Sequence, residues 1–357
     1  IHPGNSMDTF VVRRVKGRTY LANINVEPRI VMVDEPNRRL VPMVSSKYFL
    51  LHDFANPNYT PRAFLEAYFG GTVPDQPKYG SVPDPKTKEA VMWTDLNGDG
   101  LPQADEMIFS PRMLMTWSCA RMWVDHDLNI YEMNDRPMVW RPKGWTNAGA
   151  PIYGGWAAWQ PAGEPPRWFD PLKVSWPAGS GVIPTADGGF IGFFNNTENP
   201  FGKGIGSEGL GGNYVVRWDA RGKPVWCTGR HSPDFGAAPG EGRLFWNIAG
   251  LAHGCVAIVD MQCYYTWKNL VHVWDPDGLW VGRLLENPDL HAAPAEAYYL
   301  ATENFGGSLE EVTSRNRVAG LKKGDAVYIG NGQNVTSIYR ITGWDTFRRD
   351  RGRLVLT

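Results

Sequence analysis

Two segments of the chain, residues 214–226 and 270–282, share one pattern that restricts the possible folds. Each has an apolar strand, a Trp-Asp pair, two turn residues, a glycine, two further residues and a valine. Related strand-turn-strand units occupy residues 121–133, 182–194 and 326–345, with an Asp-Gly-Gly turn in the second of these. Hairpins that repeat without intervening helices are typical of β-propellers. At about 40 to 55 residues per blade, the sequence predicts an all-β fold: a six- or seven-bladed β-propeller with long loops and at most one or two short helices.

We expect a single domain over residues 1–357, with the first strands, a short helix and a loop in 1–90 and the repeated blades in 91–350. The helix is predicted within residues 57–69, with Thr60 as its N-cap and Pro61 at the first helical position. Gly70 and Gly71 then end it. A pair of β-sandwiches or an open β-helix is the alternative architecture.

Composition excludes several classes of protein. The 16 Trp, 40 Gly and 28 Pro among 357 residues favour short strands and many turns. A net charge of −1 argues against a nucleic-acid partner, and no apolar run approaches the roughly 18 to 20 residues of a membrane span. The four cysteines form no C-x-x-C pair, which argues against a zinc ribbon and leaves disulfides and buried free thiols as alternatives.

Residues 95–106 match the calcium-loop pattern D-x-N-x-D-G-x5-E, in which Gly100 permits the sharp turn. Calcium prefers six to eight oxygen ligands in flexible geometry. An ordinary acidic turn is the alternative. The sequence therefore predicts bound Ca²⁺. The expected ligands are the side chains of Asp95, Asn97 and Asp99, the carbonyl of Leu101, Gln103 through a water, and both oxygens of Glu106.

The flanks of this loop, residues 89–93 and 107–109, have the pattern of strands rather than helices. No second such loop occurs in the chain, so we expect a fixed structural ion rather than a calcium sensor. No signal peptide is visible. Calcium is abundant outside the cytoplasm, and the sequence therefore predicts a secreted or periplasmic protein.

The Trp-Asp-x-x-Gly-x-x-Val units and residues 338–343 resemble the β-propellers of NHL-type and quinoprotein-like bacterial extracellular proteins. The 95–106 loop resembles those of such propellers and of dockerin-like modules. The resemblance covers about residues 90 to 350 and implies fold more than activity. Propellers of this kind serve as polysaccharide lyases, glycosidases, sugar dehydrogenases and ligand-binding platforms.

Loops at one mouth of a propeller are the usual place for a ligand site. Histidines and carboxylates there can serve as general acids and bases, and aromatic rings and an arginine can bind an acidic sugar. Polar turns, core packing and surface ion pairs are the alternatives for these residues. The catalytic candidates are His126, Asp125, His231, Asp234 and His253, and the substrate-binding candidates are Trp145, Trp156, Trp159 and Arg230.

Taken together, these features predict a secreted calcium-binding β-propeller that acts on carbohydrate as a glycoside hydrolase or polysaccharide lyase. The alternative is a non-catalytic module of a larger extracellular protein that binds a glycan or another protein. A quinone-dependent sugar dehydrogenase is a third hypothesis.

Overall fold

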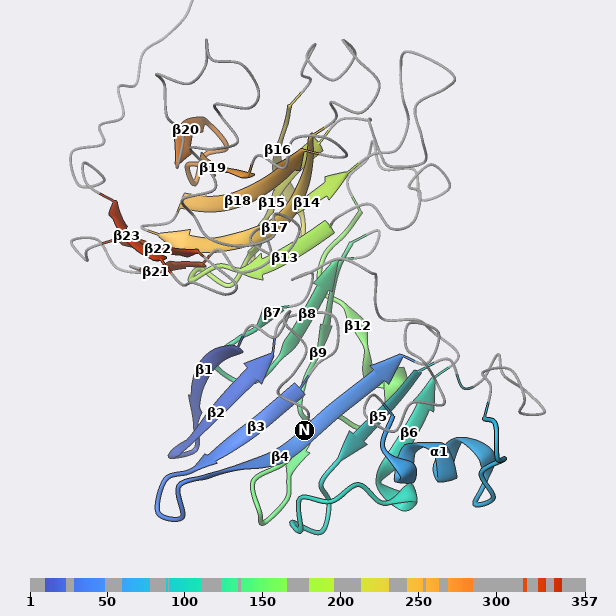
Figure 1. The fold of residues 1–357 in the computed structure, drawn as a ribbon. Coiled ribbons are helices and arrows are strands. Elements are labelled where there is room, and N and C mark those ends of the chain that lie inside the picture. The colour runs from blue at the N-terminus through green and yellow to red at the C-terminus, as the bar shows by residue number, and fades with distance from the viewer. Residues whose placement is uncertain are drawn as a thin grey trace, which may run out of the picture.

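The computed structural model is mostly β, with several antiparallel sheets (Figure 1). It contains one α-helix within the part of the chain that it describes. The described residues are 10–23, 29–48, 60–77, 88, 90–110, 123–133, 136–165, 180–195, 213–230, 243–252, 255–262, 269–284, 317–319, 327–331 and 337–341.

The first sheet has six strands that pair in chain order from β1 to β6. β1 and β2 form a hairpin joined at Lys16 and Gly17, which both have positive φ, as a tight hairpin turn requires. The pairing of β4 with β5 is not local, because the helix and a loop lie between them. The strands are β1 (Phe10–Val15), β2 (Arg18–Asn23), β3 (Arg29–Asp34), β4 (Arg39–Tyr48), β5 (Ala90–Thr94) and β6 (Met107–Ser110).

The predicted helix is confirmed as α1 (Arg62–Phe69), which ends at Gly70 with a φ of 74°. Its start lies one residue later than expected. Pro61, not Thr60, is the N-cap, because its ψ of 145° keeps it extended, and it makes no side-chain capping bond. The helix buries Phe64 and Tyr68 in a cluster that includes Trp93 of β5, so it packs on the sheet beside the loop that follows β5.

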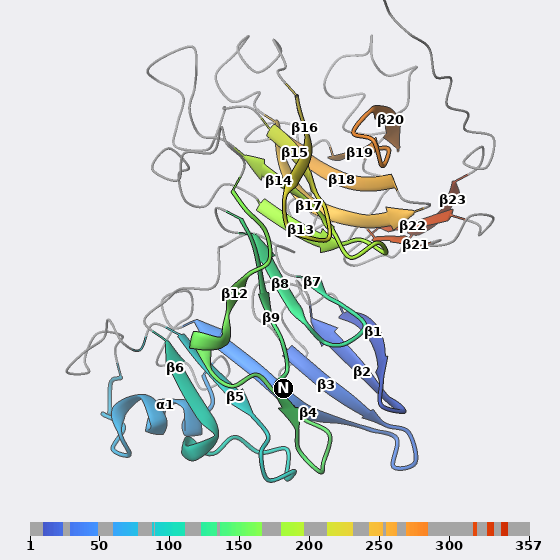
Figure 2. The ribbon, with the colours of Figure 1, turned by 180° about the vertical axis from the view of Figure 1, so that it is seen from behind.

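The later sheets are mostly four-stranded and antiparallel. The sheet of β13 to β16 contacts the sheet of β17 to β20, which contacts β21, and β13 also contacts β7 and β8 (Figures 1 and 2). Consecutive sheets are therefore spatial neighbours. Their strands are β7 (Trp123–Val124), β8 (Ile130–Met133), β9 (Pro137–Trp140), β10 (Gly144–Trp145), β11 (Pro151–Ile152), β12 (Gln160–Pro161), β13 (Ser180–Pro184), β14 (Phe190–Asn195), β15 (Asn213–Trp218), β16 (Pro224–Arg230), β17 (Arg243–Ala252), β18 (Cys255–Gln262), β19 (Asn269–Trp274), β20 (Trp280–Leu284), β21 (Arg317–Ala319), β22 (Val327–Asn331) and β23 (Ser337–Ile341).

Four hairpins in these sheets share one turn geometry, which explains the Trp-Asp-x-x-Gly pattern. The amide of the first turn residue donates to the carbonyl of the residue four positions later. The carbonyl of the first residue accepts the amide of the residue three positions later. The fourth residue has a φ between 62° and 87°, a region that favours glycine. Where the first residue is aspartate, its Oδ1 accepts the amides two and four residues later. The first residues are Asp125, Thr185, Asp219 and Asp275.

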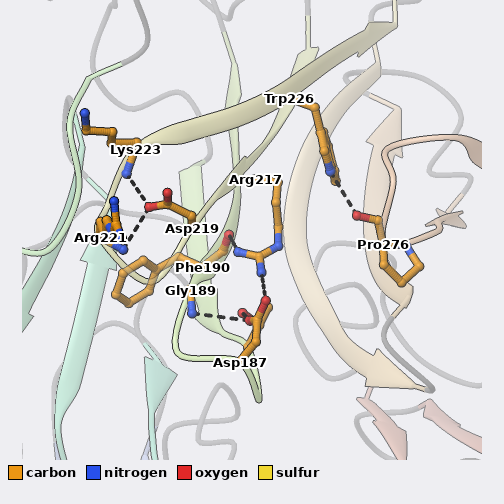
Figure 3. A network of polar contacts seen from close by, with 10 residues as sticks. Asp187, Gly189, Phe190, Arg217, Asp219, Arg221, Lys223, Trp226 and Pro276 are labelled. Atoms are coloured by element: carbon orange, nitrogen blue, oxygen red, sulfur yellow. Dashed lines mark hydrogen bonds and ion pairs between the residues drawn. The ribbon is translucent and has the colours of Figure 1, made fainter.

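The hairpin of β15 and β16 is hydrogen-bonded to the sheets on both sides. Trp218 donates its indole Nε1–H to the carbonyl of Glu164 at 2.8 Å, and the amide of Glu164 donates to the carbonyl of Gly222 at 2.7 Å. On the other side, Trp226 donates to the carbonyl of Pro276 at 3.0 Å (Figure 3). These two tryptophans therefore join sheets together.

Candidate functional site

The predicted calcium loop joins β5 to β6, which pair antiparallel from Ala90 opposite Ser110 to Trp93 opposite Met107. Strands on both sides of the loop are thus confirmed. The amide of Asp95 donates to the carbonyl of Met43 at 2.9 Å, so the first residue of the loop is fixed to β4.

Two glycines shape the loop. Gly98 has a φ of 85° and Gly100 a φ of 73°, which side chains other than glycine rarely adopt. A Cβ on Gly98 would lie 2.7 Å from the Cβ of Ala148. The loop therefore packs closely against the connection between β10 and β11, as well as making its own sharp turn.

Asp95 is the buried carboxylate of the loop, with none of its surface exposed. Its Oδ1 accepts the amide of Gly98 at 2.8 Å, whereas its Oδ2 is buried without a hydrogen-bond partner among the described residues. Burial raises the pKa of Asp95, the amides of Gly98 and Gly100 oppose that rise, and the charges of Glu106 and Asp99 add to it. A cation beside Oδ2 would remove this cost of burial.

Asn97, Asp99 and Gln103 form a network at the surface. Oδ2 of Asp99 accepts Nδ2 of Asn97 at 3.2 Å and Nε2 of Gln103 at 2.7 Å. Its Oδ1 accepts the amide of Leu101 at 2.7 Å, and this bond is the main reason that the pKa of Asp99 is lowered. Both amide side chains thus turn their nitrogen toward the carboxylate, and Oδ1 of Asn97 accepts the amide of Asp99 at 2.9 Å.

Glu106 closes the loop from its far end and is 5% exposed. Its Oε1 accepts the amides of Leu96 at 2.8 Å and Asn97 at 3.2 Å. Its Oε2 accepts the indole N–H of Trp93 at 2.7 Å and the amide of Gln103 at 3.4 Å. Both carboxylate oxygens are therefore occupied by donors of the protein itself. Trp93 was not among the predicted site residues, and its place two residues before the loop was the signal that could have revealed it.

The structure brings all six predicted ligands into this one loop. Oxygen donors of this kind suit a hard cation, and Oδ2 of Asp95 is a buried carboxylate oxygen of the loop without a hydrogen-bond donor among the described residues. Within the described ranges, no three His, Cys, Asp or Glu side chains already converge as a metal-binding group.

The catalytic candidates Asp125 and His126 lie in the turn between β7 and β8. Oδ1 of Asp125 accepts turn amides, and its Oδ2 accepts Nδ2 of Asn129 at 2.8 Å and the hydroxyl of Tyr131 at 3.0 Å. Burial, and after it Asp125, raises the pKa of Tyr131. Asp125 therefore has the same turn-forming role as Asp219 and Asp275, and His126 beside it is exposed. His231, Asp234 and His253 lie outside the described residues.

The substrate-binding candidates divide between the core and its edge. Trp159 is only 8% exposed and packs edge-on against Trp140 with ring centroids 5.4 Å apart, so its ring is a core element rather than an open platform. Trp145 is half-buried, 5.9 Å from the ring of Tyr20, and Lys16 lies 4.9 Å above its ring. Trp156 begins a short 3₁₀ turn and Arg230 ends β16, and the side chains of both lie outside the described part of the chain.

No protein-family model and no curated protein matches the chain. Among solved structures, it is similar to prolyl oligopeptidase B from Galerina marginata bound to a substrate for hydrolysis and macrocyclization. The TM-score is 0.35 and the identity 7%, over 91% of this chain and 38% of that one. The chain thus spans well under half of that protein's length. Among the described residues, no helix has the length and apolar character needed to cross a membrane.

Proposed function

We propose that residues 95–106 bind Ca²⁺ as a structural ion that fixes the connection between β5 and β6 of a secreted β-propeller. The observation that supports this most strongly is the buried Oδ2 of Asp95, which lacks a hydrogen-bond donor among the described residues. A buried carboxylate oxygen left unsatisfied is costly, and a bound cation offsets that cost.

The chemistry of the loop favours calcium over softer metals. Its side chains offer oxygen and amide groups and contain neither cysteine nor histidine, the ligands that make up structural zinc sites. Calcium also tolerates the irregular geometry of a flexible loop better than magnesium, which requires a near-ideal octahedron.

The propeller part of the proposal is supported by successive antiparallel sheets of β7 to β20, mostly four-stranded and in contact with one another. Four-stranded sheets are the blades of such folds, and 40 to 55 residues is the approximate blade length. Six or seven blades remain the count that the sequence predicts.

Action on carbohydrate, as a hydrolase or lyase, stays a prediction from the sequence. The non-catalytic binding module is its alternative. Incubation with a panel of polysaccharides separates the two: new reducing or unsaturated ends indicate an enzyme, and binding without turnover indicates a module.

Calorimetric titration with Ca²⁺ tests the proposed ion. We expect Asp95→Asn to weaken binding by roughly tenfold or more, about 1.4 kcal/mol, because it removes the buried charge. Asp105→Asn is the matched control, because this exposed carboxylate of the same loop occupies no ligand position. The Ca²⁺ affinity of this variant should stay at the wild-type value. An absence of binding heat in the wild type, or equal losses in both variants, would refute the proposal.

A further inference from the structure

Glu106 occupies the position at which a calcium loop of this pattern would be closed by two carboxylate oxygens on the ion. In this chain, both oxygens already have donors. Oε2 accepts the indole N–H of Trp93 and the amide of Gln103, and Oε1 accepts the amides of Leu96 and Asn97. A carboxylate offers about four acceptor positions, so these four donors fill them.

If a cation replaced these donors, the indole N–H of Trp93 would be left without an acceptor. Trp93 is 1% exposed and belongs to the cluster that α1 packs against. Its indole N–H, 2.7 Å from Oε2, therefore has no access to water as a substitute acceptor. A buried donor left unsatisfied bears the full cost of its desolvation, which opposes a bidentate contact between Glu106 and an ion.

Asp95 has the opposite character, although both carboxylates are buried. Its Oδ2 has no hydrogen-bond donor among the described residues, and its Oδ1 faces the amide of Gly98 inside the loop turn. The loop thus contains one buried carboxylate with all its acceptor positions filled and one with an oxygen left open.

We propose that Glu106 is a positioning residue that closes the loop by hydrogen bonds, and that the cation is held by Asp95, Asn97, Asp99 and the carbonyl of Leu101, with water in place of Glu106. This rests on the proposed calcium site. Through the amides of Leu96 and Asn97, Glu106 fixes the backbone between the first two ligands. The loop then keeps its shape whether or not the ion is bound.

Thermal unfolding and Ca²⁺ titration of Glu106→Gln test this, with Asp95→Asn for comparison. In Glu106→Gln, an NH₂ group takes the place of Oε2 and faces the indole N–H of Trp93 and the amide of Gln103, which then lose their acceptor. We therefore expect a lower melting temperature in EDTA. The Ca²⁺ affinity of the folded variant should fall by less than that of Asp95→Asn, because Glu106 acts on the ion only through the backbone that it holds, whereas Asp95→Asn removes a ligand of the ion. The reverse result, loss of Ca²⁺ affinity in Glu106→Gln with an unchanged melting temperature in EDTA, would overturn the inference.

Trp93→Phe provides a second variant if Glu106→Gln does not fold. It removes one donor from Oε2 and frees that acceptor position. If Glu106 were a ligand in competition with Trp93, this variant would bind Ca²⁺ more tightly than the wild type. We expect an affinity within about threefold of the wild type instead.

The same variant assigns the Trp93 indole signal in an amide-nitrogen NMR spectrum of the wild type. We expect that signal to keep its hydrogen-bonded position at saturating Ca²⁺, because Oε2 stays with Trp93. Movement of this indole signal more than the others would show that Glu106 turns to the ion.

Failure of the calcium site itself gives a different result. If the wild type does not bind Ca²⁺, the proposed function is wrong. The melting temperature of Glu106→Gln in EDTA then tests by itself whether Glu106 closes the loop by hydrogen bonds. A lower value upholds hydrogen-bonded closure by Glu106, and an unchanged value overturns it.

Discussion

Two glycines with nearly equal backbone angles have very different surroundings. Gly17 has a φ of 76°, and a Cβ added to it would meet nothing within 4 Å, whereas a Cβ on Gly222, with a φ of 78°, would lie 2.5 Å from the carbonyl oxygen of Ala162. Gly17 is required only by its turn. Gly222 is required by its turn and also by the neighbouring sheet. An added Cβ would meet the carbonyl of Ala162, a main-chain group that cannot rotate away.

Alanine at these two positions separates the two requirements. We expect Gly17→Ala to cost about 1 to 2 kcal/mol, the strain of a left-handed alanine. Gly222→Ala should cost about 1 to 3 kcal/mol more, because the added methyl overpacks the contact with Ala162. Unfolding by urea measures both variants, and equal losses would contradict the close approach of the sheets.

Single residues also show where prediction from the sequence stopped. The pattern of residues 95–106 located the loop, its glycine turn and its strand flanks. It did not reveal that Glu106 accepts four hydrogen bonds, because the donors depend on how the backbone folds back on itself. Likewise, Trp159 was expected among the substrate-binding rings, although its ring packs in the core; composition alone does not distinguish a buried ring from an exposed one.

At the scale of elements, strands and hairpins were predictable and long-range pairings were not. Strand-turn-strand patterns with an aspartate and a glycine in the turn predicted β13 with β14 and β15 with β16, since each pairing is local. The pairing of β4 with β5 spans the helix and a loop, and no local pattern specifies it. The recurrent Trp-Asp-x-x-Gly motif, in contrast, has a local cause, the aspartate that accepts two turn amides.

The charge of such an aspartate makes its turn sensitive to acid. The amide of Lys223, and after it that of Arg221, lowers the pKa of Asp219. Because the folded pKa is the lower one, Asp219 stabilises the protein above its unfolded pKa of about 3.9, and this contribution is lost as the pH falls through the folded value.

Asp219→Asn keeps the accepting oxygen and removes the charge. We expect the wild type to be more stable than Asp219→Asn at pH 6, and the difference to shrink as the pH falls below about 4. Urea midpoints at several pH values measure it. Asp127→Asn serves as the control, since that exposed carboxylate lies in the turn between β7 and β8, which has the same geometry, but is not its first residue. A difference that stays constant with pH would show that the charge of Asp219 has no role in the turn.

At the scale of the whole molecule, the sheets are joined by indole-to-carbonyl hydrogen bonds as well as by apolar packing. Trp226 of β16 reaches Pro276 in the turn between β19 and β20 (Figure 3). Its ring lies 2.7 Å from the position that a Cβ on Gly278 would take. This contact belongs to neither sheet alone, so it reports on how they associate.

Trp226→Phe removes this hydrogen bond and keeps an aromatic ring. We expect a loss of about 0.5 to 1.5 kcal/mol in the free energy of unfolding, with faster amide exchange in the turn after β19. Trp280→Phe is the matched control, because Trp280 is 54% exposed and a surface change of this kind costs about 0.5 kcal/mol or less. Equal losses in both variants would mean that the Trp226 contact does not hold the sheets together.

Both tryptophans of the β15–β16 hairpin donate to main-chain carbonyls, Trp218 to Glu164 and Trp226 to Pro276. A main-chain carbonyl is present whatever side chain its residue has. The two hydrogen bonds of a duplicated copy of this hairpin would therefore need no particular side chain in its new neighbours, whereas the packing of the Trp226 ring would still need a glycine at the place of Gly278. Such a chain could lengthen by gene duplication wherever that glycine recurs.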